Sequence, residues 1–329
     1  MKRLLALLLI VGCWSSASWA TVGYREWTRQ GLRISVWYPS ASPASQRQLG
    51  PFELSYAFDG TPRRGPWPVL VFSHGNNGQV HNHYLTLQAL AHAGYVVIAP
   101  QHGSDGVAKT LDVSDALSAR VRDIDRAIDA VYDDPELGRV VSRKRVNALG
   151  YGLGGTTVLL AAGANLEQDA IDAHCKRHAD EDMDLCSNDP VSAVKQKLGA
   201  LFSNFSRASS IEAASRSVSV HGAVAVVAPM GQGLAFQRDQ LLVSRLLSVA
   251  IDGDVIRPPQ YHANAIYKAL PGISTLLTVP GHHYAFLAPL PSWMMKKEEY
   301  FTVNDPPNFD REAFLRHINS ALLRFFNAR

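Results

Sequence analysis

Hydrophobic residues follow two different spacings along most of the chain. Short runs rich in Val and Ile predict β-strands, whereas apolar residues that recur every three or four positions predict helices with one buried face. The predicted strands are residues 32–38, 69–72, 95–99, 145–149, 221–227, 246–251 and 274–279. The predicted helices are residues 85–93, 117–131, 156–164 and 261–270, followed by a last helix for which Asp310 is the expected N-cap.

This alternation of strands and helices predicts the fold class. Strands bounded by helices at this rhythm indicate an α/β fold with a mostly parallel central sheet, covered by helices on both faces. Residues 168–216 carry no strand pattern. We therefore expect one domain over residues 21–329, in which residues 168–216 form an insertion, or lid, over the carboxyl edge of the sheet, where ligands bind in such folds.

The N-terminus has the pattern of an export signal. Lys2 and Arg3 supply positive charge, residues 4–11 are apolar, and Ser18-Trp19-Ala20 has the form of a small-x-small cleavage site. The apolar run is too short for a transmembrane helix, which takes about 20 residues. The pattern predicts a signal peptide over residues 1–20 and a protein that is secreted or lies in the bacterial periplasm. Lipidation at Cys13 is the alternative.

The sequence gives no support for a nucleic-acid partner or for a bound metal ion. The formal net charge is +3, from 32 basic and 29 acidic residues, and no cluster of Lys and Arg stands out. A nucleic-acid partner is therefore not expected. His81 and His83 have a metal-like spacing, but no set of carboxylates accompanies them. We expect neither a metal nor another cofactor.

Two cysteines remain after cleavage at Ala20. Cys175 and Cys186 flank a polar, acidic stretch of the chain. In an oxidising compartment such a pair predicts a disulfide within the insertion, and two free thiols are the alternative. Closing so short a loop would stabilise the fold by roughly 2–3 kcal/mol.

A glycine-rich turn lies between a predicted strand and a predicted helix. Its sequence is Gly150-Tyr151-Gly152-Leu153-Gly154. This is the place and form of the G-x-S-x-G turn, or nucleophile elbow, on which hydrolases of the α/β class carry their catalytic serine. Gly152 stands where the serine would be.

An acid and a base follow the turn in the order that such a site needs. Asp254 comes just after a predicted strand, in Asp254-x-x-x-Pro258, and His283 comes just after the last one. Asp252 competes with Asp254 for the role of the acid, but Asp254 better matches the D-x-x-x-P turn. His282 competes with His283 for that of the base, but the Tyr-Ala-Phe-Leu sequence that follows favours His283. The expected oxyanion donors are the backbone N–H groups of Asn76 and Leu153.

These motifs together resemble a known family. Ser73-His74-Gly75, Gly94-Tyr95-Val96-Val97 with Ala99-Pro100-Gln101-His102, the glycine turn, the Asp254-x-x-x-Pro258 turn and His283-Tyr284-Ala285-Phe286-Leu287 occur in this order. In these respects the chain is similar to predicted dienelactone hydrolases related to platelet-activating-factor acetylhydrolases. The resemblance runs from Val36 to the final helix. It implies an α/β-hydrolase fold and a carboxylic-ester hydrolase with a serine–aspartate–histidine triad, often exported and without a cofactor.

Gly152 departs from that family in the one residue that attacks the substrate. Losing the serine of such a triad costs about a millionfold in turnover, and leaves roughly 10³–10⁴ over the uncatalysed reaction from the oxyanion hole and binding. Glycine accepts the strained backbone of the turn freely, so the change is structurally mild. Ser73 lies beside the expected oxyanion hole, but its hydroxyl is expected to cap backbone. His102 is expected to stabilise a turn.

A rival interpretation of the glycines is a dinucleotide-binding fingerprint. Gly150, Gly152 and Gly155 have the G-x-G-x-x-G spacing. That fingerprint requires a strand after the helix, ending in an acidic residue, and here a polar segment follows instead. Two hypotheses therefore stand ahead of an oxidoreductase. One is a pseudoenzyme that binds an ester or a lipid-like small molecule; the other is an esterase of short acyl esters that uses water or another nucleophile.

Overall fold

The computed structural model describes residues 21–103, 113–187, 219–296 and 303–328. Its strands are β1 (Thr21–Arg29), β2 (Leu32–Ser40), β3 (Ser45–Leu49), β4 (Phe52–Phe58), β5 (Trp67–Ser73), β6 (Val96–Gln101), β7 (Val141–Tyr151), β8 (Asn165–Leu166), β9 (Ala223–Val227), β10 (Leu234–Ala235), β11 (Arg245–Asp252) and β12 (Ser274–Pro280). Its helices are η1 (Val80–His83), α1 (Tyr84–His92), α2 (Val113–Asp133), α3 (Leu137–Val140), α4 (Leu153–Ala161), α5 (Gln168–His178), α6 (Met183–Ser187), α8 (Ala263–Ala269), η3 (His283–Phe286), α9 (Ser292–Met295) and α10 (Arg311–Asn327).

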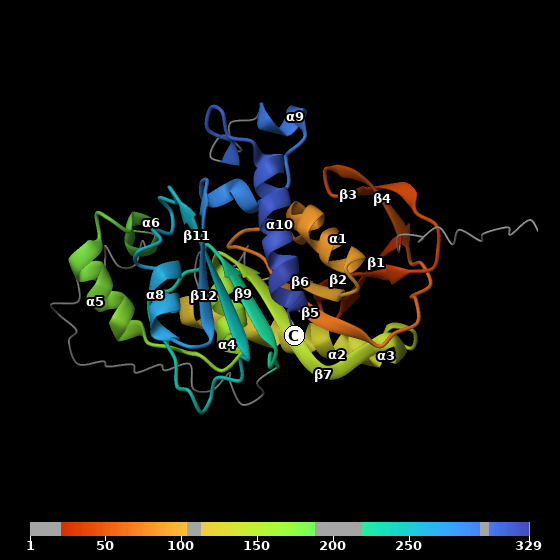
Figure 1. Ribbon diagram of the computed structural model, residues 1–329, viewed down its shortest axis with the longest axis horizontal. Helices are drawn as coiled ribbons and strands as arrows, with labels where there is room; N and C mark the ends of the chain where they lie inside the picture. The colour runs from red at the N-terminus through yellow and green to blue at the C-terminus, as the bar shows by residue number, and fades with distance from the viewer. Residues whose placement is uncertain (1–20, 104–112, 188–218, 297–302, 329) are drawn as a thin grey trace, which may run out of the picture.

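One large sheet organises the molecule (Figure 1). The order of its strands is β12-β11-β9-β7-β5-β6-β2-β1-β4-β3. The six strands from β12 to β6 are all parallel to their neighbours. Strand β2 then pairs antiparallel to β6, and β1 pairs antiparallel to β2. The predicted fold class, a mostly parallel central sheet flanked by helices, is therefore confirmed.

Both faces of this sheet are buried, as an almost continuous apolar sequence in the inner strands requires. Along β5, Val69 and Val71 face one apolar cluster, while Leu70 and Phe72 face the other, because successive side chains of a strand point to opposite faces. Helices α2, α4 and α8 contribute to the first cluster. Helices α1 and α10 contribute to the second, and both lie on the viewer's side of the sheet in Figure 1.

The sequence pattern did not reveal the N-terminal strands β1, β3 and β4. Strand β3 (SQRQL) is polar and almost entirely exposed, so it has no hydrophobic period to detect. It exists because it pairs antiparallel with β4 at the edge of the sheet.

The boundaries of two helices can be compared with the prediction. Helix α4 begins at Leu153, three residues earlier than the predicted start at 156. The predicted N-cap Asp310 is confirmed, since its side chain accepts a hydrogen bond from the backbone of Ala313.

The insertion is only partly described. Its first part forms α5 and α6, which the predicted disulfide Cys175–Cys186 joins. Residues 188–216 of the predicted lid lie outside the described residues, as do the predicted signal peptide 1–20 and Cys13. Within the described ranges no helix has the length and apolarity needed to cross a membrane.

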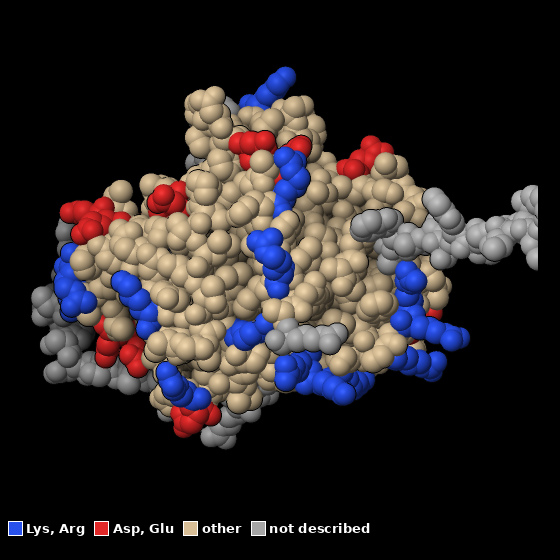
Figure 2. Space-filling model, in the orientation of Figure 1, with Lys and Arg blue, Asp and Glu red and all other residues tan. Residues whose placement is uncertain are grey.

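Charge is spread unevenly over the face seen in Figure 2. Most acidic residues lie along its upper side, with others at the lower left, whereas basic residues run down the middle over α10, along the lower right edge and at the left. Strand β11 points its carboxyl end toward the upper side in Figure 1. The residues that follow β5, β7, β11 and β12 therefore meet at that edge of the sheet, where α/β folds place their ligands.

Candidate active site

The elbow between β7 and α4 is built around glycines. Gly152 has φ 55° and ψ −124°, a conformation that glycine adopts without the strain a side chain would bring. Its backbone N–H donates to the carbonyl of Val227, at 3.0 Å. A Cβ on Gly150 would lie 2.3 Å from the carbonyl oxygen of Gly154, and one on Gly154 would lie 2.0 Å from that of Ser73. The residues two positions before and after the elbow residue must therefore be glycine for β7, α4 and β5 to approach this closely.

Position 152, in contrast, has room for a side chain. A Cβ built there lies 3.6 Å from Gly75 Cα and 3.9 Å from His283 Nε2, with nothing nearer outside its own chain neighbours. A serine at this position would place its hydroxyl one bond further along, within reach of the imidazole. The space in which a nucleophile would lie, and the base that would activate it, are thus next to each other.

His283 and Asp254 form a hydrogen-bonded pair. The Nδ1 of His283 lies 2.8 Å from Oδ2 of Asp254, which is almost fully buried. Because an ionised carboxylate only accepts hydrogen bonds, Nδ1 carries the proton and Nε2 is left to face Gly152. The other carboxylate oxygen, Oδ1, accepts from the backbone N–H groups of Ile256 (2.9 Å) and Arg257 (2.8 Å). Both oxygens of Asp254 are therefore held in place.

Asp252 and His282, the alternative candidates for the acid and the base, are not part of this pair. His282 Nε2 is 2.9 Å from Oδ1 of Asp305, and Asp252 is exposed. Tyr151, the residue before the elbow glycine, donates its hydroxyl to the carbonyl of His283 at 2.9 Å and so anchors the loop that carries the imidazole. Burial raises the pKa of Tyr151 well above its ordinary value, which keeps this donor protonated.

The expected oxyanion donors belong to the two segments next to position 152, the start of α4 and the loop after β5. Leu153 is the first residue of α4, so its backbone N–H has no acceptor within the helix. Asn76 follows Gly75, whose Cα lies beside position 152. A carbonyl oxygen placed between these two N–H groups would be stabilised as it gained negative charge.

A second arrangement of Ser, His and Asp lies beneath the loop that carries Asn76. The hydroxyl of Ser73 is 3.0 Å from Nε2 of His102, whose Nδ1 is 3.0 Å from Oδ2 of Asp123. The sequence suggested that the hydroxyl of Ser73 caps backbone. In the structure it is hydrogen-bonded to the buried His102 instead. Ser73 and His102 are at most 2% exposed, so no substrate can reach this hydroxyl. Burial also holds the pKa of His102 well below its ordinary value.

Arg120 connects this buried group to the start of α4 and to the loop after β5, the two segments that carry the expected oxyanion donors, and no sequence motif pointed to it. Its Nε donates to Oγ1 of Thr157 at 3.1 Å, and its Nη2 donates to the carbonyl of His74. Thr157 in turn donates to the carbonyl of Leu153 at 2.9 Å. The fully buried guanidinium thus joins the first turn of α4 to the loop that follows β5. The only sequence signal was a charged residue within the apolar face of a helix.

The sequence also raised a metal site and a dinucleotide-binding unit, and the described residues form neither. Nowhere among them do three or more His, Cys, Asp or Glu side chains group so as to hold a metal ion. His83 instead lies among the rings of Phe72, Tyr151 and Phe286. After α4 the chain forms β8, which pairs with β10 and not with the large sheet. The strand that a dinucleotide-binding unit needs at this point is not formed.

Comparison with known proteins points to the same class of fold. The sequence model of the dienelactone hydrolase family matches residues 56–218. This range begins within β4 and includes the loop after β5, the elbow and both cysteines, whereas Asp254 and His283 follow it. No curated protein matches the chain.

Proposed function

Because the chain belongs to the dienelactone hydrolase family of the α/β-hydrolase superfamily, we propose that it is an exported protein with an ester-type site that no longer forms an acyl-enzyme. The ligand is a small ester or a lipid-like ester, as in the enzymes related to platelet-activating-factor acetylhydrolase that the sequence resembles. The disulfide Cys175–Cys186 supports export, since such bonds persist in oxidising compartments.

One observation carries this proposal. The acid–base pair Asp254–His283 is assembled at 2.8 Å, and Nε2 of its histidine lies 3.9 Å from the place where the side chain of residue 152 would begin. This pair would supply the base and the orienting acid for a serine at position 152. Without it, no covalent bond to the acyl group can form, and turnover is expected to fall by about a millionfold relative to an intact triad.

Restoring the hydroxyl tests the proposal. Hydrolysis of p-nitrophenyl acetate and p-nitrophenyl butyrate is measured for the wild type and for Gly152→Ser. We expect the wild type at or near background and a gain of several orders of magnitude in kcat for the variant. Gly152→Ala is the matched control, because it adds the same Cβ without a hydroxyl and should remain inactive.

The double variant Gly152→Ser/His283→Gln checks that the gain depends on the pair. It should lose most of the restored activity, since the serine would have no base. If Gly152→Ser stays as inactive as Gly152→Ala while both remain folded, the site does not have the proposed geometry. If the wild type is already as active as Gly152→Ser, the nucleophile lies elsewhere.

The space at position 152 favours a second candidate function, slow hydrolysis by water. A water molecule that lay where the serine hydroxyl would be could give a proton to His283 Nε2 while its oxygen attacked the ester carbonyl. The alcohol would then leave with that proton, and the acid would be released directly. This path predicts steady turnover with no burst of released p-nitrophenol, and loss of activity in His283→Gln alone.

A further inference from the structure

The segment closed by the disulfide, Cys175–Cys186, docks onto the loop that carries the acid of the site. That loop, residues 253–262, is here called the acid loop. It contains no helix or strand, and Gly253 within it has φ 92°. Asp254 is held by bonds within the loop, from the backbone N–H groups of Ile256 and Arg257, and not by pairing in the sheet, so the position of these backbone groups decides where its carboxylate lies.

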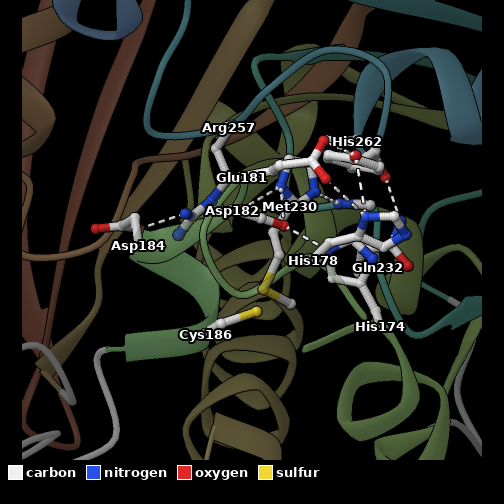
Figure 3. Close-up of polar contacts among 12 residues, drawn as sticks. His174, His178, Glu181, Asp182, Asp184, Cys186, Met230, Gln232, Arg257 and His262 are labelled. Carbon is white, nitrogen blue, oxygen red and sulfur yellow. Dashed lines mark hydrogen bonds and ion pairs between the residues drawn. The ribbon is translucent and has the colours of Figure 1, made fainter. Parts of the chain in front are cut away.

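The buried centre of the docking contact is Asp182 (Figure 3). Its Oδ2 lies 2.8 Å from Nε2 of His174, and its Oδ1 lies 3.2 Å from Nε2 of His262 at the end of the acid loop. His262 Nδ1 accepts a hydrogen bond from the backbone N–H of Gly231, at 3.1 Å. Nε2 of His262 must therefore carry the proton, and it donates to Asp182. The Asp182 and His262 side chains are fully buried, and His174 is nearly so.

A second contact lies at the more exposed side of the same surface. The hydroxyl of Tyr261, in the acid loop, donates to the carboxylate of Glu181 and lies 3.1 Å from Nδ1 of His178. Gln232 donates to the backbone carbonyl of Tyr261 at 2.6 Å. The end of the acid loop is thus bonded to the disulfide-closed segment on one side and to the loop after β9 on the other.

The third contact reaches the acid itself. Asp184, two residues before Cys186, forms an ion pair with the guanidinium of Arg257. The backbone N–H of the same arginine donates to Oδ1 of Asp254 at 2.8 Å, and Oδ2 of Asp254 is bonded to His283. One continuous series of contacts therefore runs from the disulfide through Asp184 and Arg257 to the acid–base pair.

We propose that the disulfide-closed segment positions Asp254, and that Asp184 is a positioning residue which acts through Arg257. The inference rests on the proposed function, in which Asp254 orients His283. The disulfide contributes because it restricts the conformations open to residues 175–186, so that Asp182 and Asp184 are presented together to the acid loop. If the segment loosens, the backbone at Arg257 is free to shift, and the carboxylate of Asp254 shifts with it.

The experiment uses Asp184→Asn, which keeps the size of the side chain and removes its charge. In the Gly152→Ser background we expect kcat for p-nitrophenyl butyrate to fall by about tenfold or more with KM nearly unchanged, because misplacing a catalytic group by about 1 Å costs up to about a hundredfold. Asp184→Glu should recover most of the loss, since it restores the carboxylate. The control is Asp133→Asn, which breaks the Arg29–Asp133 ion pair far along the sheet and should change nothing.

A second readout does not depend on esterase activity. In the wild type, the Nδ1 proton that His283 donates to Asp254 is followed as a downfield proton resonance by NMR. Asp184→Asn should broaden or shift this resonance, and Asp133→Asn should not. Reduction with dithiothreitol, and the double variant Cys175→Ser/Cys186→Ser, should have the same effect as Asp184→Asn.

The two readouts separate the inference from the proposed function. If Gly152→Ser is inactive but the resonance responds to Asp184→Asn, the proposed function fails and the positioning role stands. If Asp184→Asn lowers thermal stability while kcat and the resonance match the Asp133→Asn control, the segment is only structural and the inference is overturned. An unchanged resonance after complete reduction would likewise overturn the part assigned to the disulfide.

Discussion

Single residues at the elbow have separate tasks. Gly150 and Gly154 have no space for a Cβ, so they set the close approach of β7, α4 and β5. Gly152 has that space, and its lack of a side chain affects the chemistry and not the packing. Arg120 acts at the same scale, because one buried guanidinium bonds to the carbonyl of His74 and to Thr157.

Thr157→Val tests the role of the contact between Arg120 and α4. The substitution preserves shape but removes the acceptor of Arg120 Nε and the donor to the Leu153 carbonyl. In the Gly152→Ser background we expect kcat to fall by about tenfold with KM little changed, since losing a whole oxyanion donor costs about 10²–10³ and this change only displaces one. Steady-state kinetics on p-nitrophenyl acetate measures the effect.

The matched control is Thr86→Val, which breaks a partly buried hydrogen bond to Asn319 between α1 and α10. It should reduce stability by about 1 kcal/mol without the selective loss in kcat. Equal kinetic effects of the two variants would mean that Thr157 has no special relation to the oxyanion donors.

At the scale of elements, the junction of β7 with α4 is the most constrained part of the site. The first turn of α4 lies against the end of β5, with Gly154 against the Ser73 carbonyl. The same junction brings Leu153 beside the loop that carries Asn76. The proposed oxyanion site therefore depends on the same close packing that forms the elbow.

Two glycine substitutions in this junction should differ in their cost. Gly154→Ala places a Cβ 2.0 Å from backbone and should lower the free energy of unfolding by more than about 3 kcal/mol, because backbone cannot rotate away as a side chain can. Gly152→Ala meets no clash and should cost about 1–3 kcal/mol through its φ of 55° alone. Urea unfolding of both variants measures the difference. Similar losses would show that the junction relaxes more easily than its contacts indicate.

At the scale of the whole molecule, His74, His83 and His102 are among the buried histidines that resist protonation. His74, His83 and His102 are all at most 2% exposed. Burial lowers the pKa of His83 to about 3, and it holds the pKa values of His74 and His102 well below their ordinary range, with the charge of Arg120 adding to the effect. The unfolded chain would bind protons on these side chains near the usual pKa of about 6.5.

The free energy of unfolding should therefore decrease as the pH falls. Because the folded-state pKa values are depressed, the unfolded state takes up more protons as the pH falls below about 6.5, and stability that is fully present above that pH is lost toward pH 3. Each such histidine adds a slope of up to about 1.4 kcal/mol per pH unit. His83→Phe, which suits a site lined by aromatic rings, should make the decline between pH 6 and pH 4 shallower by about that amount.

The exposed His317→Gln on α10 serves as the control, and urea unfolding at several pH values gives the slopes. The control should keep the slope of the wild type. A His83→Phe variant with the same acid dependence as the wild type would mean that His83 is protonated in the folded state as readily as in the unfolded chain.

How much the sequence could predict varies from element to element. The inner strands β5, β6, β7, β9 and β11 were predictable because burial on both faces demands apolar runs, which a local pattern records. The edge strand β3 was not, because its pairing with β4 leaves no trace in its polar side chains. The disulfide was predictable from the pair of cysteines together with the export signal, which indicates an oxidising compartment.

For this protein, the sequence by itself determined the α/β class, the glycine turn without its serine, and the Cys175–Cys186 bond, since each depends on residues close together in the chain. Only the tertiary structure decided that Asp254 and not Asp252 meets His283, that Ser73 bonds to His102, and that Asp184 pairs with Arg257. These contacts join segments far apart in the chain. Whether two such side chains meet depends on strand order and on loop packing, which no local pattern of residues encodes.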